Sequence, residues 1–409
     1  MRRLVIGVLV VCPALVLAQD WNQWRGPSRT GVTTTFKAPA SWPDRPRQVW
    51  KVQAGEGHAS PIVAADRVYL FSRRAEQEVV TAYEVATGKE IWRQAYDAPY
   101  QMNSAATSHG KGPKSTPVFD RGRVYTFGIG GILSAWDAGS GKLLWRSDFK
   151  KAFSSTSPDF GVAMSPIVAS GKLIVHPGGP GNGAVVALDP MSGKQVWSWK
   201  GDGPAYASPI AATIDGVTQV ITQTQKQVVG LSLADGTLLW QIPFTTDYDQ
   251  NSVTPVVMRD LVVFSGIGKP LFAYRVARQG GQWSAAIAWQ NEQLPMYMSS
   301  PVASGDQLYG LTQRSRGQFF CADALTGKTI WTSRGREGEN AALALAGDVL
   351  LITTTEGELV VMRANPKSFD IVKRYTVAES AIWAHPAPTA SGVLIKDTES
   401  LTYLAFDGR

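Results

Sequence analysis

The chain has 409 residues, and its 40 Lys and Arg residues outnumber 33 Asp and Glu residues, which gives a formal net charge of +7. The basic residues are scattered without a run, so the composition excludes a typical nucleic-acid-binding surface. The two cysteines are Cys12 and Cys321. A chain that has lost Cys12 with a signal peptide keeps one cysteine, which excludes an internal disulfide. We expect Cys321 to be buried and to fill space in the core.

The first 18 residues have the pattern of a signal peptide. Two arginines are followed by an apolar run over residues 4–17, and the sequence Val-Leu-Ala ends at residue 18, just before Gln19. The run is too short to span a membrane comfortably, and the residues before Cys12 do not fit a lipoprotein signal. We therefore expect residues 1–18 to be cleaved, no transmembrane segment in the mature chain, and a periplasmic or secreted location.

Residues 19–47 form an extension rich in Pro, Trp and Arg, which we expect to lie across the folded domain. A single predicted strand, residues 48–51, follows. The chain then repeats one plan, in which Ser or Thr before Pro opens a unit of four short strands. Short β-branched and aromatic runs bounded by Gly, Asp and Ser predict these strands. The opening steps are Ser60-Pro61, Thr116-Pro117, Ser165-Pro166, Ser208-Pro209, Thr254-Pro255 and Ser300-Pro301.

The last hairpin of most repeats carries a glycine and, four residues later, a tryptophan. The glycine supplies a positive φ in the turn, which an acidic or Ser residue caps. A small residue six positions before the glycine leaves room for the tryptophan. We expect these tryptophans to be buried between neighbouring repeats rather than to bind a cofactor. The pairs are Gly88 with Trp92, Gly141 with Trp145, Gly193 with Trp197, Gly236 with Trp240, and Gly327 with Trp331.

The tryptophans, and one tyrosine in the same place, recur every 42 to 53 residues from Trp50 to Tyr375. Four strands in about 40–50 residues are typical of a β-propeller blade. The chain ends with three strands and no tryptophan, so strand 48–51 would complete the last blade and remove two open edges. We predict an all-β, eight-bladed β-propeller of four-stranded antiparallel blades over residues 48–409, closed by the N-terminal strand joining the C-terminal blade. Blade five lacks the Gly–Trp hairpin, and blade seven lacks the Pro and the Trp.

The segments 82–92, 135–145, 187–197 and 321–331 share a small residue, an acidic residue, Thr or Ser before Gly-Lys, and a final Trp. This pattern resembles the tryptophan-docking repeat of the pyrroloquinoline quinone (PQQ) propeller superfamily. Residues 21–27, WNQWRGP, resemble the opening of secreted PQQ-like repeat proteins. The resemblance covers nearly the whole chain. The superfamily holds quinoprotein dehydrogenases, the outer-membrane β-barrel assembly lipoprotein BamB, and many secreted propellers.

The resemblance implies two kinds of function. The dehydrogenases use a vicinal Cys-Cys disulfide over the quinone, a calcium ion held by Glu, Asn and Asp, and an Asp base. This sequence has no Cys pair and no Cys-x-x-Cys-His haem motif. BamB shares the fold and the blade count, although its lipoprotein signal is missing here.

We therefore expect a non-catalytic binding or protein-assembly platform, a monomer whose loop face binds an unknown protein or a small polar ligand. The alternative is a divergent quinone- or metal-dependent oxidoreductase. Its cofactor would be PQQ with calcium, or a transition metal bound by histidine.

The four histidines map to one end of the predicted ring, on the consecutive blades eight, one, two and three. Each lies just before a Pro-led strand or between the second and third strands of its blade. Imidazole is a common metal ligand and titrates near neutrality, so convergent histidines would hold Zn or Cu or orient an anionic ligand. The alternative is that polar residues simply gather where loops are. The candidate metal ligands are His58, His109, His176 and His385.

Other aromatic and amide side chains enter the same face close to the strand starts. A funnel lined in this way suits a small polar ligand or a peptide end. The alternative is that these side chains fill the narrow axis of the ring. The candidate funnel residues are Tyr206, Asn251, Tyr297, Asn340 and Trp383.

Overall fold

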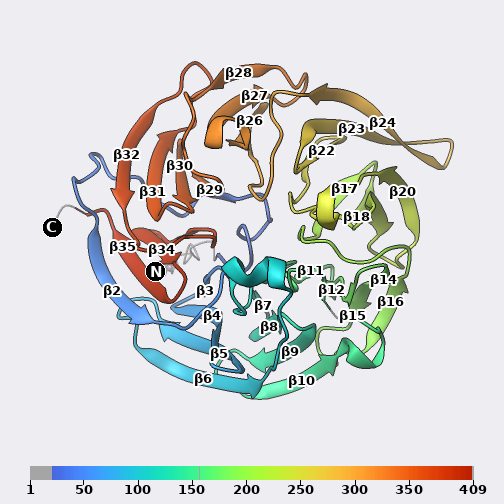
Figure 1. The fold of residues 1–409 in the computed structure, drawn as a ribbon, viewed down its shortest axis with the longest axis horizontal. Helices are drawn as coiled ribbons and strands as arrows, with labels where there is room; N and C mark the ends of the chain where they lie inside the picture. Colours follow the sequence, from blue (N-terminus) through green and yellow to red (C-terminus); the bar gives the residue numbers. More distant parts are fainter. Residues whose placement is uncertain (1–20, 156, 408–409) are drawn as a thin grey trace, which may run out of the picture.

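The computed structural model describes residues 21–155 and 157–407, so the predicted signal peptide lies outside the described residues. Eight small antiparallel sheets stand around a central axis like the blades of a propeller (Figure 1). The prediction of an all-β, eight-bladed propeller is confirmed. In the first four blades the strands are β3 (Ile62–Ala64), β4 (Arg67–Arg74), β5 (Gln77–Glu84), β6 (Glu90–Asp97); β7 (Val118–Asp120), β8 (Arg123–Phe127), β9 (Ile132–Asp137), β10 (Leu143–Asp148); β11 (Ile167–Ala169), β12 (Lys172–Val175), β15 (Val185–Leu188), β16 (Gln195–Trp199); β17 (Ile210–Ile214), β18 (Val217–Gln223), β19 (Gln227–Ser232), β20 (Leu238–Pro243).

The other four blades follow the same order, from a short inner strand to an outer strand. Their strands are β21 (Val256–Met258), β22 (Leu261–Gly266), β23 (Lys269–Gln279), β24 (Gln282–Asn291); β25 (Val302–Ser304), β26 (Gln307–Thr312), β27 (Gln318–Asp323), β28 (Thr329–Thr332); β29 (Ala341–Ala346), β30 (Val349–Thr354), β31 (Glu358–Arg363), β32 (Ile371–Thr376); β33 (Ala387–Pro388), β34 (Gly392–Lys396), β35 (Ser400–Ala405), β2 (Arg47–Gln53). The remaining elements are β1 (Val32–Thr33), β13 (Gly178–Gly179), β14 (Asn182–Gly183) and the 3₁₀ turns η1 (Ser104–His109), η2 (Phe149–Lys151), η3 (Asp247–Asp249) and η4 (Arg314–Arg316).

The ring closes through blade eight. Strand β2, from the start of the propeller, pairs antiparallel with β35 from the end of the chain, with Trp50 opposite Tyr403. Figure 1 shows the blue and red strands side by side in this blade. The closure predicted from the orphan strand is therefore confirmed: β2 is paired, and the edge of β35 is covered.

The repeated Gly–Trp spacing is explained by contacts between blades. The Trp92 ring of blade one lies on Gly141 of the next blade, where an added Cβ would come within 2.6 Å of Trp92 Cε3. The indole Nε1 donates to the Ala138 carbonyl at 3.0 Å. Only glycine leaves room for the ring, so a repeat with the complete motif supplies both a tryptophan and the site for the tryptophan of the preceding blade. The same glycine contact joins Trp50 to Gly88, Trp145 to Gly193, Trp197 to Gly236, and Trp289 to Gly327.

Trp331 of blade six has no such glycine and donates to the Asn365 carbonyl of blade seven at 2.9 Å, and Trp240 of blade four is a second exception. The next blade ends in the long β23–β24 hairpin, which lacks the Gly–Trp motif and extends beyond the ring in Figure 1. Trp240 therefore turns into its own blade, where Nε1 donates to Gln219 Oε1 at 2.6 Å. Its ring packs on Gly230, where an added Cβ would come within 2.2 Å of the indole. This contact explains why glycine replaces alanine at the small-residue position of that repeat.

A belt of hydrogen bonds around the axis explains the Ser/Thr–Pro steps. The backbone N–H of Ser60 donates to Thr116 Oγ1 at 2.9 Å, and Thr116 N–H donates to Ser165 Oγ at 3.0 Å. The pattern continues from blade to blade through Ser208, Thr254 and Ser300. His385 N–H of blade eight extends the belt by donating to Ser60 Oγ at 2.8 Å, while blade seven, which lacks the Ser/Thr–Pro step, is joined to blade six by Ala341 N–H donating to Ser299 Oγ at 2.9 Å. Each hydroxyl thus joins two neighbouring blades at their innermost strands.

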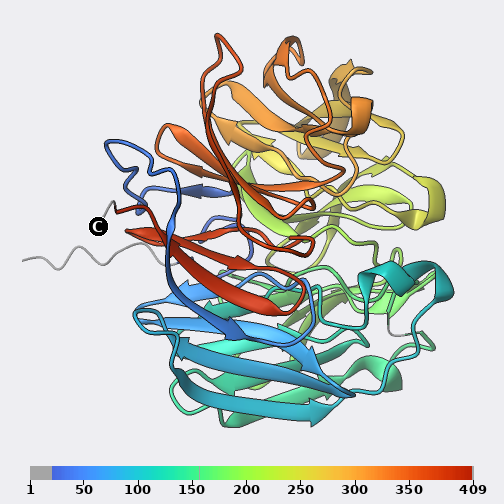
Figure 2. The same cartoon turned by 60° about the vertical axis from the view of Figure 1, so that its left-hand side comes forward.

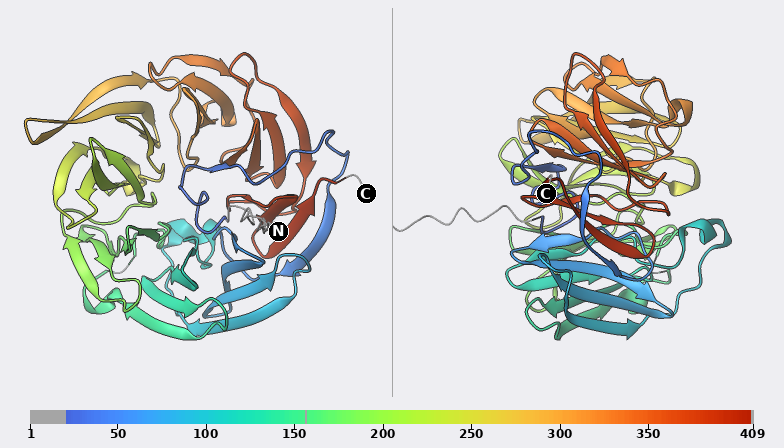
Figure 3. Two further views of the ribbon diagram at one scale, coloured as in Figure 1. Left: turned by 180° about the vertical axis from the view of Figure 1, so that it is seen from behind. Right: turned by 90° about the vertical axis from the view of Figure 1, so that its left-hand side faces the viewer.

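The segment before the propeller enters the ring. Trp21 forms an antiparallel bridge with Val63, and β1 pairs parallel with β29 at the centre. Arg29 is buried between blades three and four, where its guanidinium donates to the Ser165 and Pro209 carbonyls at 3.0 and 2.8 Å and also to the Pro166 carbonyl. The segment lies on the side of the ring away from η1, as Figures 2 and 3 show. It therefore blocks the central axis from one face.

Candidate functional site

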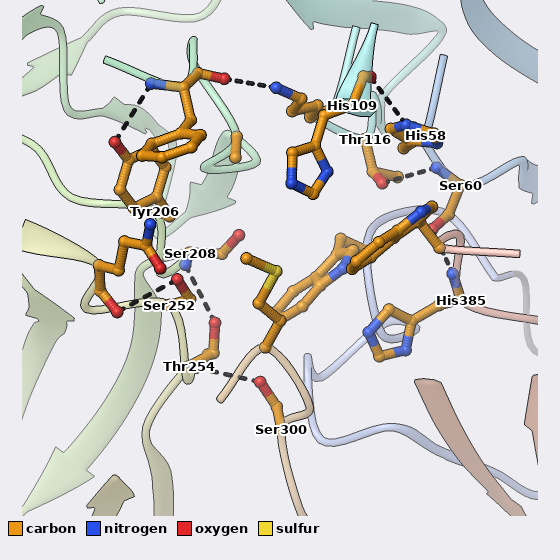
Figure 4. A pocket seen from close by; sticks show the side chains of 17 residues that line it. His58, Ser60, His109, Thr116, Tyr206, Ser208, Ser252, Thr254, Ser300 and His385 are labelled. Atoms are coloured by element: carbon orange, nitrogen blue, oxygen red, sulfur yellow. Dashed lines mark hydrogen bonds between the residues drawn. The ribbon is translucent and has the colours of Figure 1, made fainter. Parts of the chain in front are cut away.

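A pocket of about 160 Å³ lies on the axis, on the η1 side of the ring. Its walls are the loops that lead into the innermost strand of blades one to six and eight, and Trp24 of the N-terminal segment completes the lining. Figure 4 shows the labelled hydroxyls of Ser60, Thr116 and Ser208 around this space. The hydroxyl belt that holds the blades together is therefore also part of the pocket wall.

Three of the four predicted histidines meet at this pocket: His58, His109 and His385 line it. His58 Nε2 lies 3.0 Å from the His109 carbonyl oxygen, and the His109 ring points into the pocket in Figure 4. His176 is not among the lining residues. It is buried in blade three, with its Nε2 3.1 Å from the Asp202 carbonyl oxygen.

No group of three or more His, Cys, Asp or Glu side chains in residues 21–155 and 157–407 is placed to hold a metal ion. The geometry therefore gives no support to a metal shared by the four histidines, and that site stays a prediction. Burial lowers the pKa of both His58 and His385 to about 3, and it lowers the pKa of His109 as well. These rings are neutral near pH 7 and act as hydrogen-bonding groups.

His176 gives a direct test of this burial. Burial lowers its pKa from 6.5 to about 4, so the unfolded chain binds a proton there more readily than the folded chain. Its contribution to stability is complete above pH 6.5 and is lost as the pH falls toward 4. At pH 5 the loss is about 2 kcal/mol, since each pH unit corresponds to about 1.36 kcal/mol.

We expect His176→Gln to lose less stability than the wild type between pH 7 and pH 5, by about 2 kcal/mol, in urea unfolding measured at both pH values. Parallel pH dependence of the two proteins would show that folding does not lower the pKa of His176.

The predicted funnel residues divide into two groups. Tyr206 and Trp383 line the pocket. Asn251 is buried beside it, and its Nδ2 donates to the carbonyls of three other residues, so it holds loops together. Tyr297 donates to Gln250 Oε1 at 2.6 Å and reaches the pocket only through that side chain. Asn340 is buried in blade seven and does not line the pocket.

Several lining residues were missed by the sequence analysis, above all Lys114, Phe160, Gln250 and Trp24. Lys114 precedes the Thr116-Pro117 step by two positions, and that spacing from the hydroxyl belt was the available signal. Phe160 and Trp24 carried no signal, because the loop and the N-terminal segment that contain them lie outside the repeat.

The pocket does not fit the quinone–calcium centre that the superfamily implies. Calcium takes six to eight oxygen ligands, usually including carboxylates, whereas no Asp or Glu is among the described residues that line the pocket. Cys321, the one cysteine in the described ranges, is buried in strand β27 of blade six. It lies within hydrogen-bonding reach of Tyr309, and burial raises the pKa of its thiol to about 11. A vicinal disulfide over a quinone has no counterpart here.

Comparison with known proteins places the chain within this superfamily. A family described as outer membrane protein assembly factor BamB matches residues 75–333. The chain belongs to this family. The BamB of Yersinia pestis is 22% identical over 376 residues, which cover 88% of each chain.

Solved structures share the fold of this BamB-family chain. BamB from Moraxella catarrhalis superposes with a TM-score of 0.63 at 14% identity, over 89% of this chain and 98% of that one. Quinohemoprotein alcohol dehydrogenase from Comamonas testosteroni superposes with a TM-score of 0.68 at 14% identity, over 96% of this chain and 81% of that one. Both likenesses concern the fold alone. Across residues 21–155 and 157–407, the structure contains no helix with the length and apolar character that a membrane crossing requires.

Proposed function

We propose that this protein is a non-catalytic platform of the BamB kind, which binds other proteins during assembly of the outer membrane. The observation that carries the proposal is the family match over residues 75–333, together with a relative named as an outer membrane protein assembly factor that aligns over 88% of each chain. A rigid ring suits this role, because the hydroxyl belt and the tryptophan contacts join most of the blades to their neighbours.

The proposal includes a periplasmic or secreted location, which the signal-peptide pattern of residues 1–18 supports. Fractionation of cells that express the full chain tests this point. We expect a mature protein that begins near Gln19 in the periplasmic fraction. Uncleaved protein in the cytosol would contradict it.

The assembly role is tested by deleting the gene in its own host. We expect lower amounts of outer-membrane β-barrel proteins in the membrane fraction, measured by quantitative mass spectrometry, and recovery when the full-length gene is restored. Unchanged amounts of all these proteins would contradict an assembly role.

The alternative function is a divergent PQQ-dependent oxidoreductase, which the shared propeller fold favours. It is tested by adding PQQ and Ca²⁺ to the purified protein and following dye reduction with alcohols and sugars. We expect no turnover, because the lining offers a lysine and neutral histidines instead of the carboxylates that calcium requires. Reproducible turnover above a sample without protein would establish the alternative.

A further inference from the structure

The charged side chain that lines the central pocket is Lys114. Its Nζ donates to the Phe160 carbonyl, which uses one of its three N–H bonds. No ion pair involves Lys114 within the part of the chain that the structure describes, and none of the described lining residues is acidic. An ammonium group held in a pocket without a carboxylate partner retains donors for a negatively charged ligand.

The other polar groups of the pocket are mainly donors. The hydroxyls of Ser60, Thr116, Ser208, Thr254 and Ser300 accept backbone N–H groups, which leaves the hydrogen of each hydroxyl free to be donated into the pocket. His385 is 8% exposed and lines the same space. The pocket thus offers several donors to a group that only accepts, such as a carboxylate.

A second positive charge lies behind this wall. Arg25 is 1% exposed, and its guanidinium lies 5.5 Å from the ring of Trp24, which packs against His385 with ring centroids 5.0 Å apart. Its Nη2 donates to the Pro301 carbonyl at 2.5 Å, while Nε and Nη1 have no partner among the described residues. The charge of Arg25 contributes to the lowered pKa of His385, so the guanidinium acts on this end of the pocket.

The remaining walls are apolar and aromatic. Trp383 packs against His109 at 5.1 Å between ring centroids, and Phe160 packs against Tyr206 at 5.8 Å. His109 and Phe160 join these two pairs, with ring centroids 6.3 Å apart. The rings form a continuous aromatic wall, in which Phe160 is the residue whose carbonyl accepts from Lys114, and such a wall suits a flat apolar body attached to the acid group.

The charge state of the pocket agrees with this geometry. Burial lowers the pKa of Lys114 to about 8 and that of Arg25 to about 9, so both groups still carry a positive charge at neutral pH. Negative charge reaches the edge of the pocket from Asp159 and Asp249, which act on Tyr206. The interior therefore has a positive potential that a bound anion would balance.

We propose that the central pocket binds a small organic anion, a carboxylate with an aromatic or apolar body, through Lys114 and the hydroxyl belt and without a metal ion. This inference does not depend on the proposed assembly function. The aromatic wall alone would also suit a quaternary ammonium ion, but the Lys114 ammonium would repel such a cation. A calcium-bound quinone would need carboxylate ligands that the lining does not supply.

Isothermal titration calorimetry on the full purified protein, treated with EDTA, tests the proposal. The probes are benzoate and phenylacetate, each paired with its neutral amide, together with tetramethylammonium. A glycine-rich peptide ending in phenylalanine, free or amidated at its C-terminus, distinguishes a chain end from a free small molecule. We expect each carboxylate that binds to do so about 10- to 100-fold more tightly than its amide, as a charge-assisted hydrogen bond would give.

Two variants from the same loop complete the test. Lys114→Met is expected to remove the preference for carboxylate over amide, whereas Lys111→Met, which removes a half-exposed lysine that pairs with Glu76 at 3.4 Å, is expected to keep it. The comparison of carboxylate with amide on the wild type stands even if Lys114→Met folds poorly. Equal binding of acids and amides, tighter binding of tetramethylammonium, a requirement for added Ca²⁺, or no binding of any carboxylate probe would overturn the proposal.

Discussion

Replacing Arg29 with methionine is expected to lower the free energy of unfolding by about 3 kcal/mol or more. The buried guanidinium binds the Ser165, Pro166 and Pro209 carbonyls of two neighbouring blades, and its Nε donates to Gln23 Oε1 at 3.0 Å. Its removal leaves these acceptors in a water-poor interior, where each unpaired group costs about 1–3 kcal/mol. Relief of the desolvation of the buried charge offsets part of this loss.

Three matched measurements make the Arg29 prediction specific. Arg45→Met changes an exposed arginine of the same segment and should alter stability by no more than about 0.5 kcal/mol. Arg29→Lys should be intermediate, because an ammonium lacks the planar fork that reaches several carbonyls at once. Hydrogen exchange of residues 21–33 should speed up in Arg29→Met, since the segment loses its attachment to blades three and four. Unchanged unfolding and exchange would show that Arg29 does not hold the segment in the ring.

The regular part of the fold was predictable because each repeat carries its own packing partners. The Gly–Trp pairs and the Ser/Thr–Pro steps both recur at nearly regular spacing. The start of most blades, and the closure by residues 48–51, could therefore be predicted from the sequence. The position of Trp240 was also encoded, because Gly230 and Gln219 supply its site while the next blade lacks the hairpin. The position of Trp240 could be predicted only if it was known that each tryptophan normally packs on the hairpin of the following blade.

The site was predictable only in part. The loops before each inner strand project from one end of the ring, which placed His58, His109 and His385 on one face, and the structure brings these three to one pocket. His176 also follows a second strand at this end of the ring, but its ring nitrogen Nε2 lies next to the Asp202 carbonyl instead of the pocket. Lys114 and Phe160 lie in loops whose paths the repeat does not determine. The spacing of Lys114 from Thr116 places it near the axis, but its meaning depends on the absence of acidic residues from the described lining, which the sequence does not show.

The contact between tryptophan and glycine should be the main stabilising link between neighbouring blades. Trp92 is 8% exposed, packs on Gly141 and donates to the Ala138 carbonyl. Trp92→Ala is therefore expected to cost about 3–5 kcal/mol, which urea unfolding will measure. Gly141→Ala should also be costly, because its φ of +74° disfavours alanine and the new methyl would meet the indole ring at 2.6 Å.

Gly122→Ala separates these two causes. Gly122 has nearly the same φ, +76°, in an exposed turn of the same blade, and an added Cβ there meets nothing within 4 Å. We expect Gly122→Ala to cost about 1–2 kcal/mol from the backbone alone, and Gly141→Ala to cost about 1–3 kcal/mol more from overpacking. In a Trp92→Ala background the extra cost at Gly141 should vanish, because the ring that the methyl meets is gone. Equal costs at the two glycines in the wild-type background would mean that the repeated glycine serves the turn and not the tryptophan.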